Sequence, residues 1–302
     1  MTVEGFHEGE LAVQARAGVR AQAERLGVAM LAVPDLSGGI ATFLAERDFA
    51  VIAARDTDRR LWTSPLLAQA GFVEARGRTL TIHTTTEPGD PLYGLVARQA
   101  VGLLAIEFAT RRRVRVNGIL THASADELQI TVDQAFGNCP KYIQQRHISH
   151  TDHPEGVTER IVLAKTLGAD DVALIAGADT FFLGTVHPTR GADASDRGGP
   201  PGFVRVEDGQ LWWPDYPGNN MFNSFGNLHV DKTAALLFVD FEAGVSLHIS
   251  GTAVVEWVAP GVRGDDGGTG RRVRFTVEAV ASGRLDVRSD PPRPSPHNPP
   301  TT

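Results

Sequence analysis

An internal repeat constrains this chain more than any other feature of its 302 residues. Four segments of the first half recur in the second half in the same order, each shifted by about 132 positions. The pairs are Phe49-Ala-Val-Ile-Ala with Phe181-Phe-Leu-Gly-Thr, Gly71-Phe-Val with Gly202-Phe-Val, Val101-Gly-Leu-Leu-Ala-Ile-Glu-Phe108 with Ala234-Ala-Leu-Leu-Phe-Val-Asp-Phe241, and Asn117-Gly-Ile with Ser250-Gly-Thr. One such match is expected by chance, whereas four in order at a nearly constant offset indicate a tandem duplication of one folding unit.

Each repeat carries short apolar segments at the spacing typical of antiparallel β-structure. In the first repeat, strands are predicted over residues 48–54, 71–76, 79–84, 102–108, 113–121 and 127–134. Helices are predicted over residues 11–28, 40–46, 91–100 and 158–178, and a further one begins within 139–147. The pattern favours a mainly β fold, in which two tandem antiparallel barrels carry short peripheral helices.

The repeat also sets the expected domain boundaries. We expect an N-terminal unit over residues 1–150 with a leading helix, and a C-terminal unit over residues 151–290. Residues 291–302 are rich in proline and lack apolar side chains, which predicts a disordered tail.

Composition excludes several classes of partner and site. A net charge of -7 argues against nucleic-acid binding through a global positive field. No apolar run approaches about 18 residues and no signal segment is recognisable, so we expect a cytoplasmic protein without a membrane partner. The single cysteine, Cys139, excludes an internal disulfide and a site with several thiolate ligands.

The two repeats differ most in the segment that follows Thr180–His187. In the second repeat this segment is predicted to be a loop between strands, and it carries Arg190, Ser195, Arg197, Gly198 and Gly199. Guanidinium groups and closely approaching backbone N–H groups are the donors that a phosphate requires. The first repeat has no Gly-Gly pair there, so the second repeat is the better candidate for a ligand site. The alternative is a glycine-rich hairpin turn with a surface arginine.

A second polar cluster follows at Asn219, Asn220 and Ser224. Apolar residues alternate with these amides and hydroxyls, as in a wall that lines a heterocycle. The alternative is a polar turn, because asparagine tolerates unusual backbone angles and bonds its own chain.

Three histidines, His147, His150 and His153, are spaced three apart. This spacing would place them near one face of a helix, but Pro154 interrupts a helix there and no second cluster supplies further ligands. We therefore expect a solvated loop and no metal site.

Several longer strings resemble a known family. They are Phe6-His-Glu-Gly-Glu10, Phe136-Gly-Asn-Cys-Pro-Lys-Tyr-Ile143, Ser195-Asp-Arg-Gly-Gly-Pro-Pro-Gly-Phe203 and Pro214-Asp-Tyr-Pro-Gly-Asn-Asn-Met-Phe222. With them, roughly residues 5 to 280 resemble the pyridoxamine 5′-phosphate oxidase-like, FMN-binding split-barrel proteins in a tandem form.

The resemblance implies a flavin site at an interface between two barrels. Its expected phosphate ligands are Arg197 and Ser195, with Arg190 and Gly198 beside them, while Asn219, Asn220, Ser224 and Asn227 face the ribityl chain or ring and Lys141 closes from the other barrel. Asp196 departs from the family pattern, and a carboxylate at that position would be expected to neutralise Arg197.

The function implied is that of an FMN-binding oxidoreductase acting on a small-molecule substrate or electron donor. Two alternatives stay open, namely a split barrel that binds F420 or heme, and a non-catalytic flavin-binding or structural protein. No general acid or base is identified from the residues. A homodimer and an interface made within one chain are both compatible with the repeat.

Overall fold

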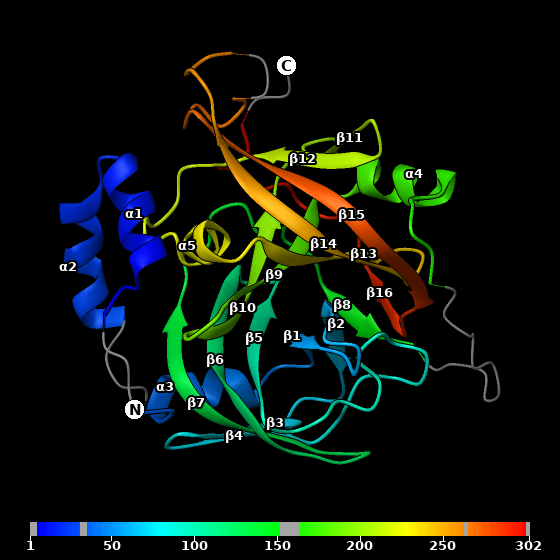
Figure 1. Ribbon diagram of the computed structural model, residues 1–302. Helices are drawn as coiled ribbons and strands as arrows, with labels where there is room; N and C mark the ends of the chain where they lie inside the picture. The colour runs from blue at the N-terminus through cyan, green and yellow to red at the C-terminus, as the bar shows by residue number, and fades with distance from the viewer. Residues whose placement is uncertain (1–4, 31–34, 152–162, 263–264, 300–302) are drawn as a thin grey trace.

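Two β-sheets occupy the centre of the computed structural model, which describes residues 5–30, 35–151, 163–262 and 265–299 (Figure 1). Each sheet has seven antiparallel strands, ordered β2-β1-β5-β6-β7-β4-β3 in the first and β10-β9-β13-β14-β15-β12-β11 in the second. The second order is the first with each strand replaced by its repeat counterpart. The predicted mainly β fold with two tandem barrels is therefore confirmed.

The strands of the first sheet are β1 (Phe49–Arg55), β2 (Leu61–Leu67), β3 (Val73–Arg76), β4 (Thr79–Ile82), β5 (Gln99–Glu107), β6 (Arg112–Ala123) and β7 (Leu128–Gly137). Those of the second are β9 (Thr180–His187), β10 (Gly191–Gly198), β11 (Arg205–Glu207), β12 (Gln210–Pro214), β13 (Thr233–Asp240), β14 (Val245–Trp257) and β15 (Arg271–Arg284). A separate two-stranded sheet pairs β8 (Ile148–His150) with β16 (Val287–Ser289).

Strand β10 is the segment that the sequence predicts to be a loop with phosphate ligands. The predicted loop is wrong, whereas the phosphate role stays a prediction. All eight residues of β10 pair antiparallel with β9. Asp193 and Asp196 of β10 pair with Arg115 and Arg113 of the first barrel, so a polar sequence forms a largely buried strand. Its counterpart β2 is likewise a strand that the sequence analysis does not predict.

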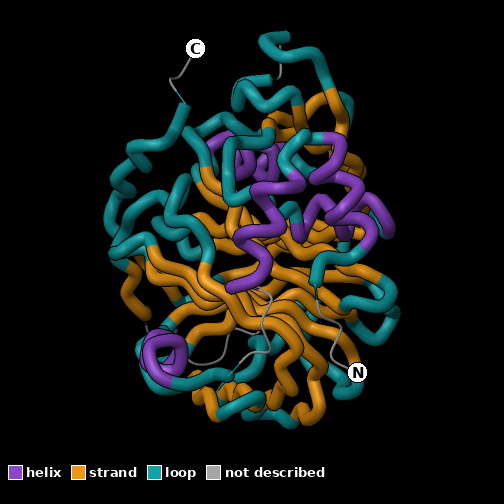
Figure 2. The backbone as a smooth tube through the Cα atoms, turned by 90° about the vertical axis from the view of Figure 1, so that its left-hand side faces the viewer, coloured by secondary structure: helices purple, strands orange, loops and turns teal. Residues whose placement is uncertain are grey.

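The helices are α1 (Glu8–Arg16), α2 (Arg20–Met30), α3 (Gly38–Ala45), α4 (Ala169–Gly177) and α5 (Asn223–Val230). The helix predicted over residues 40–46 is confirmed by α3. The single helix predicted over residues 11–28 is instead two, because the chain turns at Gly18 with φ +70°. Helices α1 and α2 lie to the left of the strands in Figure 1, and Figure 2, seen from that side, shows helices in front of the strands.

The remaining helix predictions fail for local reasons. Residues 91–98 form turns and bends, and residues 99–100 already belong to β5, whereas the helix at the equivalent place in the second repeat is α5. The segment 139–147 runs without a helix, since Tyr142 takes a left-handed φ of +68°. Helix α4 begins at Ala169, and residues 158–162 of the predicted helix lie outside the described residues.

The two barrels pack through their edge strands. Strand β10 lies on β5 and β6 of the first barrel, and β2 lies on β13 and β14 of the second. Gly102 permits this approach, because a Cβ atom there would lie 2.6 Å from the Asp193 backbone. A shared apolar cluster that includes Phe49, Phe108, Phe182 and Phe241 fills the space between the barrels. The interface thus has an apolar cluster of its own in addition to the two barrel cores.

The chain after Pro291 is bound along residues 144–146 rather than extended into solvent. Gln145 and Arg293 exchange two backbone hydrogen bonds, of 3.0 and 2.7 Å. The predicted disorder is therefore contradicted for residues 291–299, whereas residues 300–302 lie outside the described part. The boundary expected at residue 150 stays a prediction. No helix in the described part of the chain has the length and apolarity to cross a membrane.

Candidate functional site

Two adjoining hollows lie where β10 of the second barrel crosses β6 of the first. The first hollow, beneath α5, has a volume of about 80 Å³, and the second hollow, toward residues 138–142, has a volume of about 110 Å³. Their shared walls are Arg115, Arg197, Asp215, Tyr216, Gly218 and Asn219. Both repeats therefore contribute to one site, with β6 supplying arginines and β10 and the 215–225 segment supplying the rest.

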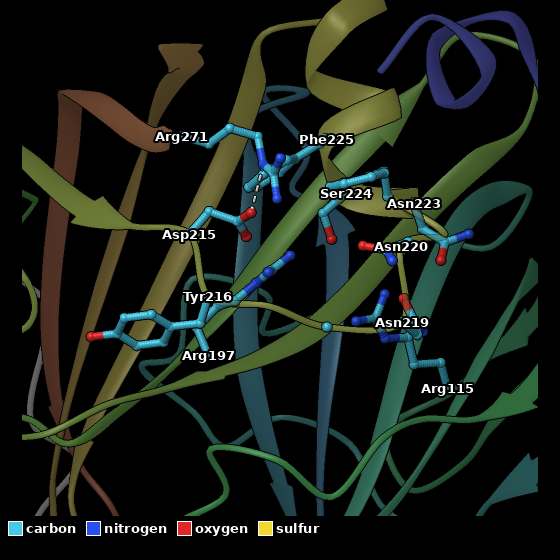
Figure 3. Close-up of a pocket in the computed structure, with 12 residues that line it drawn as sticks. Arg115, Arg197, Asp215, Tyr216, Asn219, Asn220, Asn223, Ser224, Phe225 and Arg271 are labelled. Carbon is cyan, nitrogen blue, oxygen red and sulfur yellow. Dashed lines mark hydrogen bonds and ion pairs between the residues drawn. The ribbon is translucent and has the colours of Figure 1, made fainter. Parts of the chain in front are cut away.

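Arg197 occupies the centre of this site. It is the third of the alternate residues Asp193, Ser195 and Arg197, which share one face of β10 because strand side chains alternate. Figure 3 shows its guanidinium and the Ser224 hydroxyl pointing into the same space below α5. The Arg197 Nε atom is buried and has no hydrogen-bond partner among the described residues, and the guanidinium carbon lies 5.5 Å from the Phe225 ring.

The charge of Arg197 persists despite its burial. Burial and then the nearby Arg115 charge lower the pKa of Arg197 to about 10, so it remains protonated at neutral pH. A half-buried cation that has no ion-pair partner among the described residues is stabilised when a ligand supplies the counter-charge.

Arg115 is held by a buried network at the barrel interface. Its Nη1 donates to Asp193 Oδ2 at 3.1 Å, and Asp193 also accepts from Ser224 Oγ at 3.1 Å and Asn117 Nδ2 at 3.3 Å. Ser195 Oγ lies 3.2 Å from Ser224 Oγ and extends the network behind the first hollow. These bonds lock strand β10 onto β6 and fix the start of α5 against both.

Asp196 does not neutralise Arg197 as its neighbouring position suggested. It forms an ion pair with Arg113 of the first barrel, whose other Nη atom donates to the Cys139 carbonyl at 2.9 Å. Burial raises the pKa of Asp196 although the Arg113 charge opposes this effect. Adjacent residues of a strand face opposite sides, so Asp196 reaches Arg113 at the second hollow instead of pairing with its neighbour Arg197.

The far wall of the first hollow is made by the segment that leads into α5. Asp215 accepts from Arg271 Nε at 2.8 Å, and the Arg271 guanidinium lies 5.1 Å from the Phe222 ring. Burial raises the pKa of Asp215 against the opposing Arg271 charge. Asn219 Nδ2 donates to Asn138 Oδ1 at 3.2 Å, which ties this segment to the first barrel.

The structure separates the residues predicted for the site into two groups. Those that line a hollow are Arg197, Gly198, Asn219, Asn220, Ser224 and Lys141. The other three lie elsewhere. Ser195 is buried behind Ser224, the Arg190 guanidinium donates to the Gly5 carbonyl, and Asn227 donates to Thr185 Oγ1 at 3.0 Å.

Sequence reasoning did not find the residues that the first barrel contributes. Arg113, Arg115 and Asn117 occupy alternate positions of β6, while Val114 and Val116 between them enter the first core. This alternation of polar and apolar residues was readable from the sequence as a strand with one polar face. Asp193, Asp215 and Arg271 were also missed, because their partners lie far away along the chain.

The structure brings together His7, Glu8 and His187, whose ligand atoms lie within 4.8 Å of one another. His7 Nδ1 accepts from the Gly9 N–H at 3.1 Å, and His187 Nδ1 accepts from the Thr189 N–H at 3.2 Å. Each neutral ring therefore carries its proton on Nε2, which leaves no lone pair for a metal ion. Of the predicted loop histidines, His147 and His150 are described and His153 lies outside the described residues.

Residues 169–261 match the family profile described as pyridoxamine 5′-phosphate oxidase. No curated protein matches the chain. Similar solved structures include HupZ of Group A Streptococcus, at 13% identity and a TM-score of 0.33, covering 41% of this chain and 100% of that one. A putative pyridoxamine 5′-phosphate oxidase from Lactobacillus delbrueckii is 16% identical, with a TM-score of 0.30 and coverages of 38% and 93%.

A further match is the FAD binding protein from Mycobacterium smegmatis, at 12% identity and a TM-score of 0.28, with coverages of 41% and 98%. Each of these structures covers about two fifths of the chain. The profile match lies within the repeat that carries Arg197. The resemblance predicted from the sequence is therefore confirmed, and the chain has the pyridoxamine 5′-phosphate oxidase-like split-barrel fold in two tandem copies.

Proposed function

We propose that this chain binds a phosphate-bearing flavin, FMN in the first instance, between its two barrels and serves as an oxidoreductase. The observation that carries the proposal is Arg197, whose half-buried guanidinium lines both hollows and whose buried Nε has no hydrogen-bond partner among the described residues. A phosphate would supply the missing charge and accept from its orphaned Nε.

The charge balance of the site supports an anionic ligand. Five cationic side chains line the two hollows, namely Arg113, Arg115, Lys141, Arg197 and Arg271, against the two carboxylates Asp196 and Asp215. Counting Asp193 behind the wall still leaves an excess of two positive charges. The whole chain carries -7, so this excess is a local feature of the site.

The size of the hollows indicates how a flavin would be accommodated. Each hollow alone is smaller than the roughly 300–1,000 Å³ of ordinary ligand sites. Since Asp215, Tyr216, Gly218 and Asn219 line both, the 215–219 segment is their common wall. We propose that a flavin occupies both hollows together once this segment shifts outward, with its phosphate at Arg197.

The protein residues would then bind and orient the ligand. Arg197 and Arg115 hold the phosphate, Ser224 and Asn219 offer polar atoms to the ribityl chain, and the Tyr142 and Tyr216 rings, 5.0 Å apart, shield the second hollow from water. The bound flavin supplies the redox chemistry, and the chain supplies its position and electrostatic surroundings.

The residues of the same site also bear on the other cofactors proposed for a split barrel, F420 and heme. A deazaflavin such as F420 carries phosphate and meets the same requirement at Arg197. Heme is supported less directly, because the described residues that line the two hollows include no histidine and offer only Cys139, Tyr142 and Tyr216 as axial ligands.

The duplication creates a second position that corresponds to this site, and that position lacks the arginines of the site. Leu67 stands where the second repeat has Arg197, since each pairs with the corresponding phenylalanine of its neighbouring strand. His248 replaces Arg115, and its Nδ1 lies 2.9 Å from the Thr63 carbonyl. We therefore propose one flavin per chain, bound without a second chain.

The test compares FMN with riboflavin, which lacks the phosphate, by flavin fluorescence quenching. Arg197→Met keeps the apolar stem and removes the charge, and it should weaken FMN binding about ten- to hundredfold. Riboflavin binding should change little. Arg190→Met is the matched control, because this arginine of the same hairpin bonds Gly5 instead of lining a hollow. A wild-type preference for FMN that persists in Arg197→Met would refute the assignment.

A further inference from the structure

The C-terminal residues 291–299 lie against the segment that carries Lys141 and Tyr142, two residues of the second hollow. The tail begins this contact at the Gln145–Arg293 backbone pair. Arg111 adds two hydrogen bonds from its Nη2, to the Arg293 carbonyl at 3.4 Å and to the Pro294 carbonyl at 3.3 Å. A proline-rich sequence that cannot build a core is thus ordered by hydrogen bonds to the first barrel.

Gln144 is the buried side chain at the centre of the contact, with only 1% of its surface exposed. Its Oε1 accepts from the Ser295 N–H at 2.8 Å and from Asn298 Nδ2 at 3.0 Å. Its Nε2 donates to Asn298 Oδ1 at 3.0 Å and to the Tyr142 carbonyl at 2.8 Å. All four hydrogen-bonding positions of the amide are filled, and the tail fills three of them.

Tyr142 is held at both ends of its backbone by the same cluster. Its N–H donates to Ser295 Oγ at 3.3 Å, and its carbonyl accepts from Gln144. These bonds stabilise a φ of +68°, in the left-handed region that is unfavourable for an aromatic residue. The carbonyl also lies against Gly198, where a Cβ atom would approach it to 1.9 Å. The tail therefore sets the position of Tyr142 on strand β10, next to Arg197.

The Tyr142 side chain connects the tail to the wall of the site. Its hydroxyl donates to the Pro217 carbonyl at 3.1 Å, and its ring lies 5.0 Å from that of Tyr216. Both contacts are with the 215–219 segment, the wall common to the two hollows. Lys141, one residue earlier, lines the second hollow from the first barrel.

We infer that residues 292–298 form a C-terminal strap, with Gln144 and Ser295 as positioning residues that place Lys141 and Tyr142 against an anionic ligand. The inference rests on the proposed flavin site for its functional consequence. Without the strap, Gln144 keeps one hydrogen-bond partner of four, and Tyr142 loses the acceptor that holds its left-handed backbone. The wall of the second hollow then becomes mobile, and the ligand must order it on binding.

The experiment compares three full-length or shortened chains. A chain ending at Asp290 loses the strap, whereas a chain ending at Asn298 keeps every hydrogen bond described above and is the matched control. Because the longer deletion could impair folding, Asn298→Ala in the full chain removes the two bonds to Gln144 and leaves the Gln145–Arg293 pair. Amide hydrogen exchange over residues 138–146, without ligand, and the Kd for FMN are measured on each.

Faster exchange over residues 138–146 and an FMN Kd about tenfold higher are expected for the chain ending at Asp290 and, in smaller degree, for Asn298→Ala. The control should match the wild type in both. Unchanged exchange in Asn298→Ala and in the folded shorter chain would overturn the strap, and faster exchange with an unchanged Kd would overturn its role in the site. If the wild type binds no FMN, the proposed function fails while the exchange result still decides whether the strap exists.

Discussion

Replacing Asp193 by asparagine should destabilise the fold and strengthen anion binding at the same time. Asp193 is buried, accepts from Arg115, Asn117 and Ser224, and is the carboxylate that balances Arg115 at the barrel interface. Asparagine preserves the shape but removes the charge. Removing one partner of a buried ion pair costs about 3–5 kcal/mol, because the other charge is left uncompensated.

Urea denaturation measures the first effect as a lower midpoint at unchanged slope. The second effect follows from charge, since Arg115 and Arg197 then face the hollows with one less carboxylate nearby. Added inorganic phosphate should therefore stabilise Asp193→Asn more than it stabilises the wild type. As a control, Asp193→Leu combined with Arg115→Met should recover much of the lost stability. A single variant as stable as the wild type, or one that phosphate does not rescue, would refute this account of the interface.

Two further predictions concern packing and pH. Gly102→Ala should lower the free energy of unfolding by about 1–3 kcal/mol, because the new methyl group would overlap the Asp193 backbone. The control is Gly177→Ala, which should change the free energy of unfolding by less than about 1 kcal/mol, because its Cβ would meet nothing within 4 Å. Equal effects in the two variants would contradict the close packing. Burial raises the pKa of Glu10 from 4.5 to about 7, so its ionisation opposes folding and the wild type loses stability as pH rises through this window. Relative to the wild type, Glu10→Gln should gain about 3 kcal/mol in unfolding free energy between pH 4.5 and 7. A difference that is flat with pH would count against the buried carboxyl.

The repeat made the architecture predictable, because segments at a constant offset must form equivalent strands. The seven-strand order shared by both sheets follows from that duplication. Strand β10 was not predictable as a strand, since Asp193, Ser195 and Arg197 are polar and nothing near them in sequence shows what they contact. Their partners, Arg115 and Ser224, lie 78 and 31 residues away from Asp193.

The site was predictable only for those residues that lie close together in the sequence. Arg197, Asn219 and Ser224 were recognised because they stand close together in the second repeat and differ from the first. Arg115 contributes from the other barrel, and only the docking of β10 on β6 brings it there. The order of the tail was not predicted, because its composition shows only that it cannot form a core of its own. Composition does not show that Gln144 of the first barrel accepts a hydrogen bond from the tail backbone.

The central claim is a single anion-dependent flavin site made jointly by both repeats. Equilibrium dialysis of the purified chain against FMN, with bound flavin measured by absorbance, tests it most directly. The account predicts saturation at one FMN per chain, and weaker FMN binding in both Arg197→Met and Arg115→Met, one from each barrel. Two equivalents per chain, or no saturable binding of FMN, would contradict it.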